Sequence, residues 1–407
     1  MTPLDFYRSV RARTVALAAP LSAEDQLVQS MPDASPTKWH LAHTSWFFET
    51  FVLTPHAAGY HVFDERFGFL FNSYYEALGA RVARAERGQL SRPGLTEVHS
   101  YRRHVDEAME RWLARGDADA QALATCEVGL HHEQQHQELI LTDIKHALAA
   151  NPLRPAYAAP DAARSAHATS AARTWRSFDE GLAFIGHDGP GFAFDNEGPR
   201  HRRFLRAFAL AERPVTCGEY LAFMRDRGYE RPEFWLSDGW QACRRDGWRA
   251  PLYWEPRGDA WAVFTLHGLR AVDEGETVAH VSHYEADAFA RWAGLRLPTE
   301  DEWERAAAEA PVEGRFCEGG VLHPGPARPS LFGDVWQWTQ SAYGAYPGYR
   351  APDGALGEYN GKFMSNQMVL RGGSCFTPPG HVRATYRNFF PPTARWQASG
   401  IRLARDA

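Results

Sequence analysis

The chain has 407 residues, enough for about two to three domains of the usual size of roughly 150 residues. Its 44 basic and 50 acidic side chains give a formal net charge of -6, which argues against a dedicated nucleic-acid binder, since such a protein normally carries a basic excess. Hydrophobic residues at 44% and charged residues at 23% exclude wholesale disorder, and the one departure from an average composition is an aromatic content of 13%.

Apolar residues at helical spacing predict four helices in residues 1–150. The second is expected to be capped by Ser35 or Thr37. The third and fourth are expected over about 96–115 and 118–150. Four such helices joined by loops suggest a bundle, in which metal sites are commonly built from inward-facing side chains on facing helices.

The composition changes twice after this region. Residues 151–173 are rich in Ala, Pro, Ser and Arg and are predicted to form a linker. In residues 174–407, short aromatic and β-branched runs alternate with Gly, Pro, Asp and Asn clusters, and clear helical patterns occur only at 216–227, 286–293 and 299–308. We therefore expect a multidomain protein of class α and α+β, with a helical bundle, a linker and a loop-rich α+β domain.

The cellular compartment is predicted from features that the sequence lacks. No apolar run approaches the 18 or so residues needed to span a bilayer. A short apolar stretch after Arg13 weakly imitates a signal peptide, but it contains Pro20 and leads directly into acidic residues. The five cysteines are odd in number and form no C-x-x-C pair, which suits a reducing compartment. A cytoplasmic protein without membrane or nucleic-acid partners is expected.

The strongest chemical signal is the octapeptide His131-His-Glu-Gln-Gln-His-Gln-Glu138 within the fourth predicted helix. His132 and His136 are four residues apart, so they lie one turn apart on one face and can bind a single metal ion. Glu138 follows His132 by six residues, about 120° away around the helix, and is a candidate for orienting a ligand rather than for binding. The competing interpretation is a solvated polar face that happens to carry three histidines.

A third ligand is expected from the second helix, where His40 and His43 lie among aromatic residues. His43 is favoured because it shares a helix face with Trp39 and Phe47. Three neutral imidazoles leave coordination positions open, which is the condition for catalysis. Zinc in such a site would activate water and Fe(II) would bind dioxygen, and the residues alone do not choose between them.

Two segments of the predicted bundle, Trp39-His-Leu-Ala-His43 and His132-x-x-x-His136-x-Glu138, resemble the DinB-type four-helix bundle of the ergothioneine-pathway sulfoxide synthases, the EgtB family. The remainder resembles a C-type-lectin-like domain of the formylglycine-generating-enzyme (FGE-sulfatase) type. Its motifs are Phe194-Asp-Asn-Glu197, Pro214-Val-Thr216, Arg296-Leu-Pro-Thr-Glu300, Gly333-Asp-Val-Trp336, Arg371-Gly-Gly-Ser374 and Gly400-Ile-Arg402. The two resemblances occur in the family's order and together cover nearly the whole chain.

This resemblance implies a specific chemistry. In the family, three histidines that correspond to His43, His132 and His136 hold a mononuclear non-haem Fe(II). The implied reaction uses O2 to join the sulfur of cysteine or γ-glutamylcysteine to C2 of the imidazole of Nα-trimethylhistidine (hercynine). Its product is hercynylcysteine sulfoxide, an intermediate of ergothioneine biosynthesis.

The resemblance also implies a catalytic tyrosine. Tyr74 and Tyr75 resemble a tyrosine pair in the subtype that uses free cysteine, whereas the mycobacterial subtype takes its tyrosine from the C-terminal domain. A phenol near the metal can donate a proton or a hydrogen atom to bound oxygen, since it stays protonated at pH 7. The alternative is two tyrosines that only pack.

Substrate-binding residues are implied in both halves of the chain. Arg84 and Arg87 match an arginine pair that holds the carboxylate of the sulfur donor, a task suited to guanidinium groups. A solvated basic turn is the alternative. Gln135 matches a residue that contacts the histidine-derived substrate.

Near the C-terminus, Asn388 corresponds to a substrate-binding asparagine, and Phe389 could face the trimethylammonium group through a cation–π contact. Phe390 lacks the acid of the mycobacterial pattern, which favours cysteine over γ-glutamylcysteine.

Three other functions compete with this interpretation. A zinc-dependent DinB-type thiol transferase would explain the histidines but not the second domain. A formylglycine-generating enzyme would need reactive C-terminal cysteines, and the motif region offers only Cys375. A C-type-lectin-like binding module with a degenerate bundle would need no metal at all.

Overall fold

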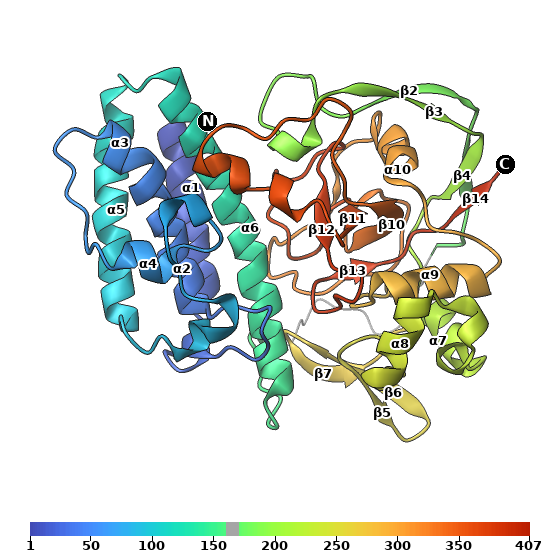
Figure 1. Cartoon of the computed structure of the whole chain (residues 1–407). Helices are drawn as coiled ribbons and strands as arrows, with labels where there is room; N and C mark the ends of the chain where they lie inside the picture. Colours follow the sequence, from blue (N-terminus) through green and yellow to red (C-terminus); the bar gives the residue numbers. More distant parts are fainter. Residues whose placement is uncertain (160–170) are drawn as a thin grey trace. The chain divides into compact units, whose positions relative to one another are not determined.

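The structure, a computed structural model, describes residues 1–159 and 171–407. The contacts within the chain divide it into two compact units (Figure 1). The first unit consists of Met1–Tyr157 and Pro352–Tyr359, and the second consists of Ala158–Ala351 and Asn360–Ala407. The first unit thus includes a short segment from late in the chain. The middle of the predicted linker, residues 160–170, lies outside the described residues.

Four long helices build the first unit, and Figure 1 shows them running side by side. They are α1 (Pro3–Ala18), α2 (Thr37–Phe48), α5 (Leu95–Arg115) and α6 (Ala120–Ala150), with the short α3 (Thr54–His56) and α4 (Phe67–Phe71) between α2 and α5. Helix α1 packs on α6, and α2 packs on both α5 and α6. The predicted four-helix bundle is confirmed. Among the described residues, no helix combines the length and the hydropathy that a membrane crossing requires.

Side-chain caps begin two of the long helices of the first unit. Thr2 caps α1 in a capping box with Asp5, and the Asp119 side chain caps α6 by accepting a hydrogen bond from the Ala122 N–H. The prediction that Ser35 or Thr37 caps α2 is wrong, because α2 begins after Pro36 without a side-chain cap. The Ser35 hydroxyl instead accepts a hydrogen bond from the Arg87 guanidinium at 2.9 Å.

All twelve residues of α2 are buried, although six of them are Thr, Lys, His or Ser. A helix that is buried on every side has no solvated face and so shows no amphipathic stripe. The polar side chains of α2 must therefore find their partners inside the bundle, because an unpaired buried polar group is costly.

One buried ionic network holds four helices together. The Glu133 carboxylate on α6 accepts hydrogen bonds from Arg11 on α1 at 2.9 Å and from Arg102 on α5 at 3.1 Å. The same two guanidinium groups donate to α2, Arg11 to the Ser45 hydroxyl at 2.8 Å and Arg102 to the Thr44 hydroxyl at 2.9 Å. Burial alone would raise the pKa of Glu133, but the two arginines outweigh it and lower that pKa to about 2.

The second unit is a loop-rich α+β structure, as predicted. Its largest sheet has the strand order β12 (Asn388–Phe390), β11 (Met368–Arg371), β10 (Trp336–Ala342) and β13 (Ser399–Gly400). Strand β10 pairs antiparallel with β11 and parallel with β13. A second sheet consists of β1 (Trp175–Phe178), β4 (Phe208–Ala211) and β14 (Ala404–Asp406). The smaller sheets are β2 (Gly181–Ile185) with β3 (His201–Leu205), β5 (Trp254–Arg257) with β6 (Ala260–Thr265) and β7 (Gly268–Ala271), and β8 (Gly314–Arg315) with β9 (Phe332–Gly333).

In the described residues of the second unit, four α-helices accompany these sheets, and the sequence pattern does not predict one of them. The predicted three correspond to α7 (Cys217–Arg225), α9 (His283–Trp292) and α10 (Glu300–Ala307), and the fourth is α8 (Ser237–Arg245). The buried positions of α8 hold only Gly239, Ala242 and Cys243, so the sequence shows no large apolar stripe. The buried face of α8 needs small residues because Tyr284 packs closely on it. A Cβ atom on Gly239 would lie 2.6 Å from the Tyr284 ring.

The motifs of the second unit hold its interior together. Arg371 is fully buried and forms ion pairs with Glu300 at 3.1 Å and Glu304 at 2.9 Å. Arg402 and Trp303 both donate hydrogen bonds to the Gln337 amide oxygen, at 2.6 and 2.7 Å. These residues pair with one another in the interior, an arrangement that stabilises the fold.

The ionic network predicts a large stability effect in the first unit. Glu133→Gln removes the carboxylate that Arg11 and Arg102 share, and loss of one partner of a buried pair typically costs about 3–5 kcal/mol. Chemical unfolding should show a loss of this size. The matched control is Glu127→Gln, an exposed position on the same helix, which should change the free energy of unfolding by no more than about 0.5 kcal/mol. Equal stabilities of the two variants would contradict the role of the network.

Candidate metal centre

Three histidines meet inside the bundle. His43 lies in the middle of α2, and His132 and His136 lie one turn apart on α6. The Nε2 atom of His132 is 3.2 Å from Nε2 of His43 and 3.0 Å from Nε2 of His136. All three side chains are buried, with at most 8% of their surface exposed. The structure thus brings together the three residues that the sequence marks as metal ligands.

These imidazoles are neutral at pH 7. Burial lowers the pKa of His132 to about 3 and those of His43 and His136 well below the usual value. The mutual proximity of the rings lowers the last two further, since two positive charges so close together repel each other. A neutral imidazole carries one proton and one lone pair, and the lone pair is what binds a metal ion.

The proton of His43 can be located from its contacts. Its Nδ1 atom lies 2.6 Å from the Phe71 carbonyl oxygen, which can only accept a hydrogen bond. Nδ1 therefore carries the proton, and the lone pair of Nε2 points toward His132. Two nitrogens that share a metal ion at about 2.1 Å and subtend about a right angle lie about 3 Å apart, as these atoms do. The donor set fits a divalent metal ion of the imidazole-binding kind, such as iron or zinc.

Aromatic rings surround the three histidines and exclude water from them. Trp39 and Trp46 stack on His43, at centroid separations of 4.5 and 5.4 Å. Phe47 lies 4.9 Å from His132. In such an apolar environment, electrostatic interactions are stronger than in water.

His40, the alternative to His43, lies behind the three histidines rather than among them. Its Nδ1 atom is 2.7 Å from Nδ1 of His136, and its Nε2 atom is 3.1 Å from the Asp143 carboxylate. The structure thus places His43, rather than His40, beside both His132 and His136. The Phe71 carbonyl and His40 contact the far side of the His43 and His136 rings. The orienting role expected of Glu138 stays a prediction.

The predicted tyrosines lie close to this cluster. Tyr75 is fully buried, and its ring packs on Tyr74 at 4.8 Å and on Trp46 at 5.6 Å. Trp46 in turn stacks on His43. Burial raises the pKa of Tyr75 well above its usual value, so the phenol keeps its proton.

A third tyrosine, which no sequence pattern marks, contacts a ligand ring directly. The Tyr359 ring lies 5.6 Å from the His132 ring, and its hydroxyl donates a hydrogen bond to the Gln135 amide oxygen. Its segment is anchored to the first unit because the Glu358 carboxylate accepts hydrogen bonds from the backbone N–H groups of Glu76 and Ala77, at 3.0 and 2.9 Å. The sequence indicates this tyrosine only through the resemblance to the mycobacterial subtype, whose catalytic tyrosine comes from the C-terminal domain.

Of the two predicted arginines, the structure brings one to the cluster. Arg87 is buried, and its guanidinium carbon lies 3.5 Å from the centre of the Trp39 ring, the same ring that stacks on His43. It donates hydrogen bonds to the Ser35 hydroxyl and the Ser73 carbonyl, and within the described part of the chain no carboxylate pairs with it. Burial lowers its pKa. Such a cation favours an anionic ligand. Arg84 is exposed.

The predicted substrate residues of the second unit lie on β12. The Phe389 ring stacks on Tyr343 at 4.0 Å and lies 5.9 Å from Phe363. The Asn388 side-chain oxygen accepts a hydrogen bond from the Phe389 N–H. Their contacts with a substrate stay a prediction.

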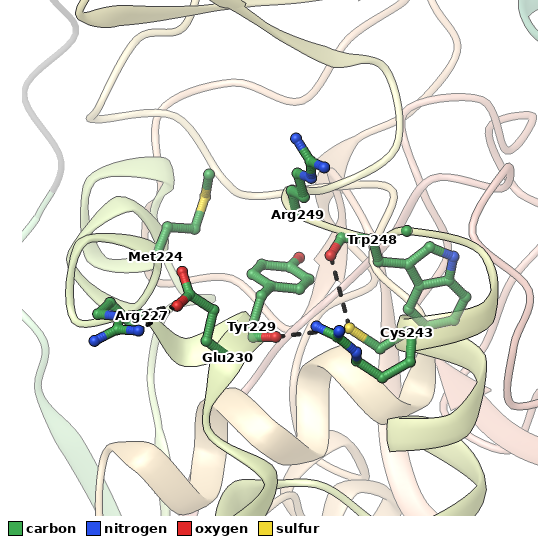
Figure 2. A pocket seen from close by; sticks show the side chains of 9 residues that line it. Met224, Arg227, Tyr229, Glu230, Cys243, Trp248 and Arg249 are labelled. Carbon is green, nitrogen blue, oxygen red and sulfur yellow. Dashed lines mark hydrogen bonds and ion pairs between the residues drawn. The ribbon is translucent and has the colours of Figure 1, made fainter.

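The second unit also holds a cavity of about 510 Å³ between α7 and α8 (Figure 2). Cys243 lies in its wall, where the thiol faces the carbonyl oxygens of Tyr229 and Trp248 at 3.9 and 3.7 Å. Burial raises the pKa of this thiol to about 11, so it is protonated and a weak nucleophile at neutral pH. None of the nine residues drawn in Figure 2 is a predicted site residue.

Comparisons with known proteins find similar sequences for both halves of the chain. The sulfatase-modifying factor enzyme 1-like domain matches residues 177–329 and 329–407. The chain is 32% identical to the hercynine oxygenase of Mycobacterium tuberculosis over 97% of this chain and 96% of that protein. It is 31% identical to the hercynine oxygenase of Mycolicibacterium thermoresistibile over 92% of this chain and 88% of that protein. It is 24% identical to ergothioneine biosynthesis protein 1 of Schizosaccharomyces pombe over 53% of this chain and 28% of that protein.

The histidine cluster predicts one tightly bound divalent metal ion per chain. Replacing His43, His132 or His136 with alanine should in each case abolish metal binding, measured as metal content after dialysis. A chelator should also lower the melting temperature of the unaltered protein, since a ligand present at a hundred times its Kd stabilises by about 2.7 kcal/mol. His104→Ala on α5, whose Nε2 contacts the His61 carbonyl, should retain the metal. Full metal content in all three alanine variants would contradict the assignment.

Proposed function

The chain belongs to the hercynine oxygenase family, and on this premise we propose that it is an O2-dependent sulfoxide synthase of ergothioneine biosynthesis. The proposed reaction consumes hercynine, a thiol and O2. One C–S bond forms as the imidazole C–H and the S–H bonds break, one oxygen atom becomes the sulfoxide oxygen, and the other leaves as water. The observation that carries the proposal is the convergence of three buried, neutral histidine nitrogens within the bundle.

His43, His132 and His136 would hold Fe(II). When bound, Fe(II) supplies the one-electron chemistry with O2 that amino-acid side chains do not provide. The three protein ligands leave coordination positions open for substrates, as catalytic metal sites require. The stacked rings of Trp39 and Trp46 exclude water around His43 and so protect reactive species from side reactions.

The proton donor in this proposal is a tyrosine hydroxyl. Tyr359 is the first candidate, because its ring contacts His132 and its Oη atom is held by the Gln135 amide. Tyr74 and Tyr75 form a second layer, since the Tyr74 ring lies 6.2 Å from Tyr359. A phenol held in one orientation near the reacting atoms is suited to deliver a proton from Oη.

Arg87 would bind the carboxylate of the sulfur donor. Its buried guanidinium has hydrogen bonds to neutral groups only, so a substrate carboxylate would supply the missing negative charge. Arg84, which is exposed, would add a weaker attraction. Gln135 would contact hercynine, and Asn388 and Phe389 keep the substrate-binding role that the family resemblance implies. Cysteine is the favoured donor over γ-glutamylcysteine.

The proposal is tested by anaerobic loading with Fe(II), followed by O2 uptake in the presence of hercynine plus cysteine or γ-glutamylcysteine. We expect uptake that requires both substrates, with faster turnover for cysteine and a sulfoxide as the product. Loading with Zn(II) is the matched control and should give no turnover. Turnover with Zn(II) in the absence of O2 would instead indicate a DinB-type thiol transferase.

Replacing the proton donor should change the product rather than only the rate. Tyr359→Phe removes the hydroxyl but keeps the ring packing, so oxygen should be diverted to the thiol and the ratio of sulfoxide to oxidised thiol should fall by about 100-fold or more, the usual size of a general acid's contribution. Product analysis by mass spectrometry measures this ratio. Tyr74→Phe and Tyr75→Phe should have smaller effects. Tyr60→Phe, whose hydroxyl donates to Glu49, is the control. An unchanged ratio in the Tyr359 variant would exclude it as the donor.

A further inference from the structure

His136 differs from the other two histidines of the cluster in what lies behind it. Its Nδ1 atom, on the ring edge opposite Nε2, is 2.7 Å from Nδ1 of His40. Nε2 of His40 is 3.1 Å from the Asp143 carboxylate, and the same carboxylate oxygen accepts a hydrogen bond from the Ser35 N–H at 2.8 Å. His40 and Asp143 are buried, with 2% and 6% of their surface exposed. The chain Asp143–His40–His136 thus links α6 to α2 and back to α6.

The direction of every proton in this chain follows from the acceptors at its two ends. A carboxylate accepts only, so Nε2 of His40 carries the proton that it shares with Asp143. Neutral His40 then has its lone pair on Nδ1. The proton between the two Nδ1 atoms must therefore belong to His136, which leaves the Nε2 lone pair of His136 facing His132. If His40 were reversed, His136 would carry its proton on Nε2 and could not bind a metal ion.

The three candidate ligands are held in three different ways. Nδ1 of His43 donates to a neutral backbone carbonyl, that of Phe71. Nδ1 of His132 is buried without a hydrogen-bond partner among the described residues. Only His136 is connected to a carboxylate, through His40. Because a hydrogen bond to an anion draws the Nδ1 proton away from the ring, it makes Nε2 a stronger donor.

We infer that His40 and Asp143 form a positioning relay that fixes the tautomer and orientation of His136 and strengthens its bond to the metal ion. Neither residue touches the metal or the reacting atoms. The relay rests on the proposed function in one respect, because it requires a metal ion at the three histidines. It explains why a second histidine on α2 is buried three residues before His43, where an apolar side chain would otherwise fill the space at less cost.

The affinity for a probe metal tests the relay without reliance on turnover. The Kd for Co(II) is measured by competition with a chromophoric chelator in the full-length protein. His40→Phe should weaken binding about 10- to 100-fold and Asp143→Asn about tenfold, within the range seen when the partner of a metal-bound histidine is lost. His40→Gln, which can still accept and donate a hydrogen bond, should recover part of the loss. His104→Gln is the matched control and should bind as the unaltered protein does.

The tautomers provide a readout that simple loss of packing would not move. In the Zn(II)-loaded, ¹⁵N-labelled protein, NMR of the histidine side chains should show the proton of His136 on Nδ1 and that of His40 on Nε2. This measurement uses the unaltered chain, so it stands even if His40→Phe does not fold. Two results would overturn the relay alone. One is a proton on Nδ1 of His40. The other is a Kd for Co(II) within twofold of that of the unaltered protein in both His40→Phe and Asp143→Asn. Failure of the unaltered protein to bind Co(II) would overturn the proposed function as well.

Discussion

Three neutral imidazoles buried around a common point are the constraint on which the first unit depends. Each must be shielded from water, each must be oriented so that Nε2 faces its neighbours, and none can become charged without repelling the others. Helix α2 meets this requirement by being buried on all sides, so that His43 sits between two tryptophan rings. Helix α6 meets it by presenting two histidines one turn apart. The bundle is therefore organised around a small polar centre rather than around a purely apolar core.

The cost of burying α2 is offset by ionic groups kept apart from the histidines. His132 and Glu133 are consecutive on α6 and so point about 100° apart around the helix. His132 faces the cluster, whereas Glu133 binds Arg11 and Arg102, which in turn donate to the hydroxyl groups of α2. Helix α6 thus carries the histidines of the cluster on one face and the carboxylate of the ionic network on the adjacent face. Because the arginines are paired with Glu133, their charge adds little to the histidine environment.

Local patterns predicted much of this arrangement. The spacing of His132 and His136 determines that they share a helix face, and His43 shares a helix face with the aromatic residues Trp39 and Phe47. The elements that were missed depend on contacts without a local signal. Asp143 and His40 are 103 positions apart, and Tyr359 and Gln135 are 224 positions apart. Helix α8 was missed because its buried face is made of small residues, and the cap predicted for α2 is absent because Pro36, whose side chain cannot accept a hydrogen bond, occupies the N-cap position. Sequence patterns predict which side chains share one face of a helix or strand. Contacts between side chains of distant elements depend instead on tertiary packing.

The central claim is that three histidine side chains bind one Fe(II) inside the bundle. X-ray absorption spectroscopy of the anaerobic, Fe(II)-loaded protein tests it most directly, because imidazole rings give a characteristic multiple-scattering pattern. We predict a single iron with three imidazole nitrogens at a typical metal–nitrogen distance of about 2.1 Å, the remaining ligands being light atoms from solvent. A first shell with fewer than three imidazoles, or one that contains a cysteine sulfur from the chain, would contradict it.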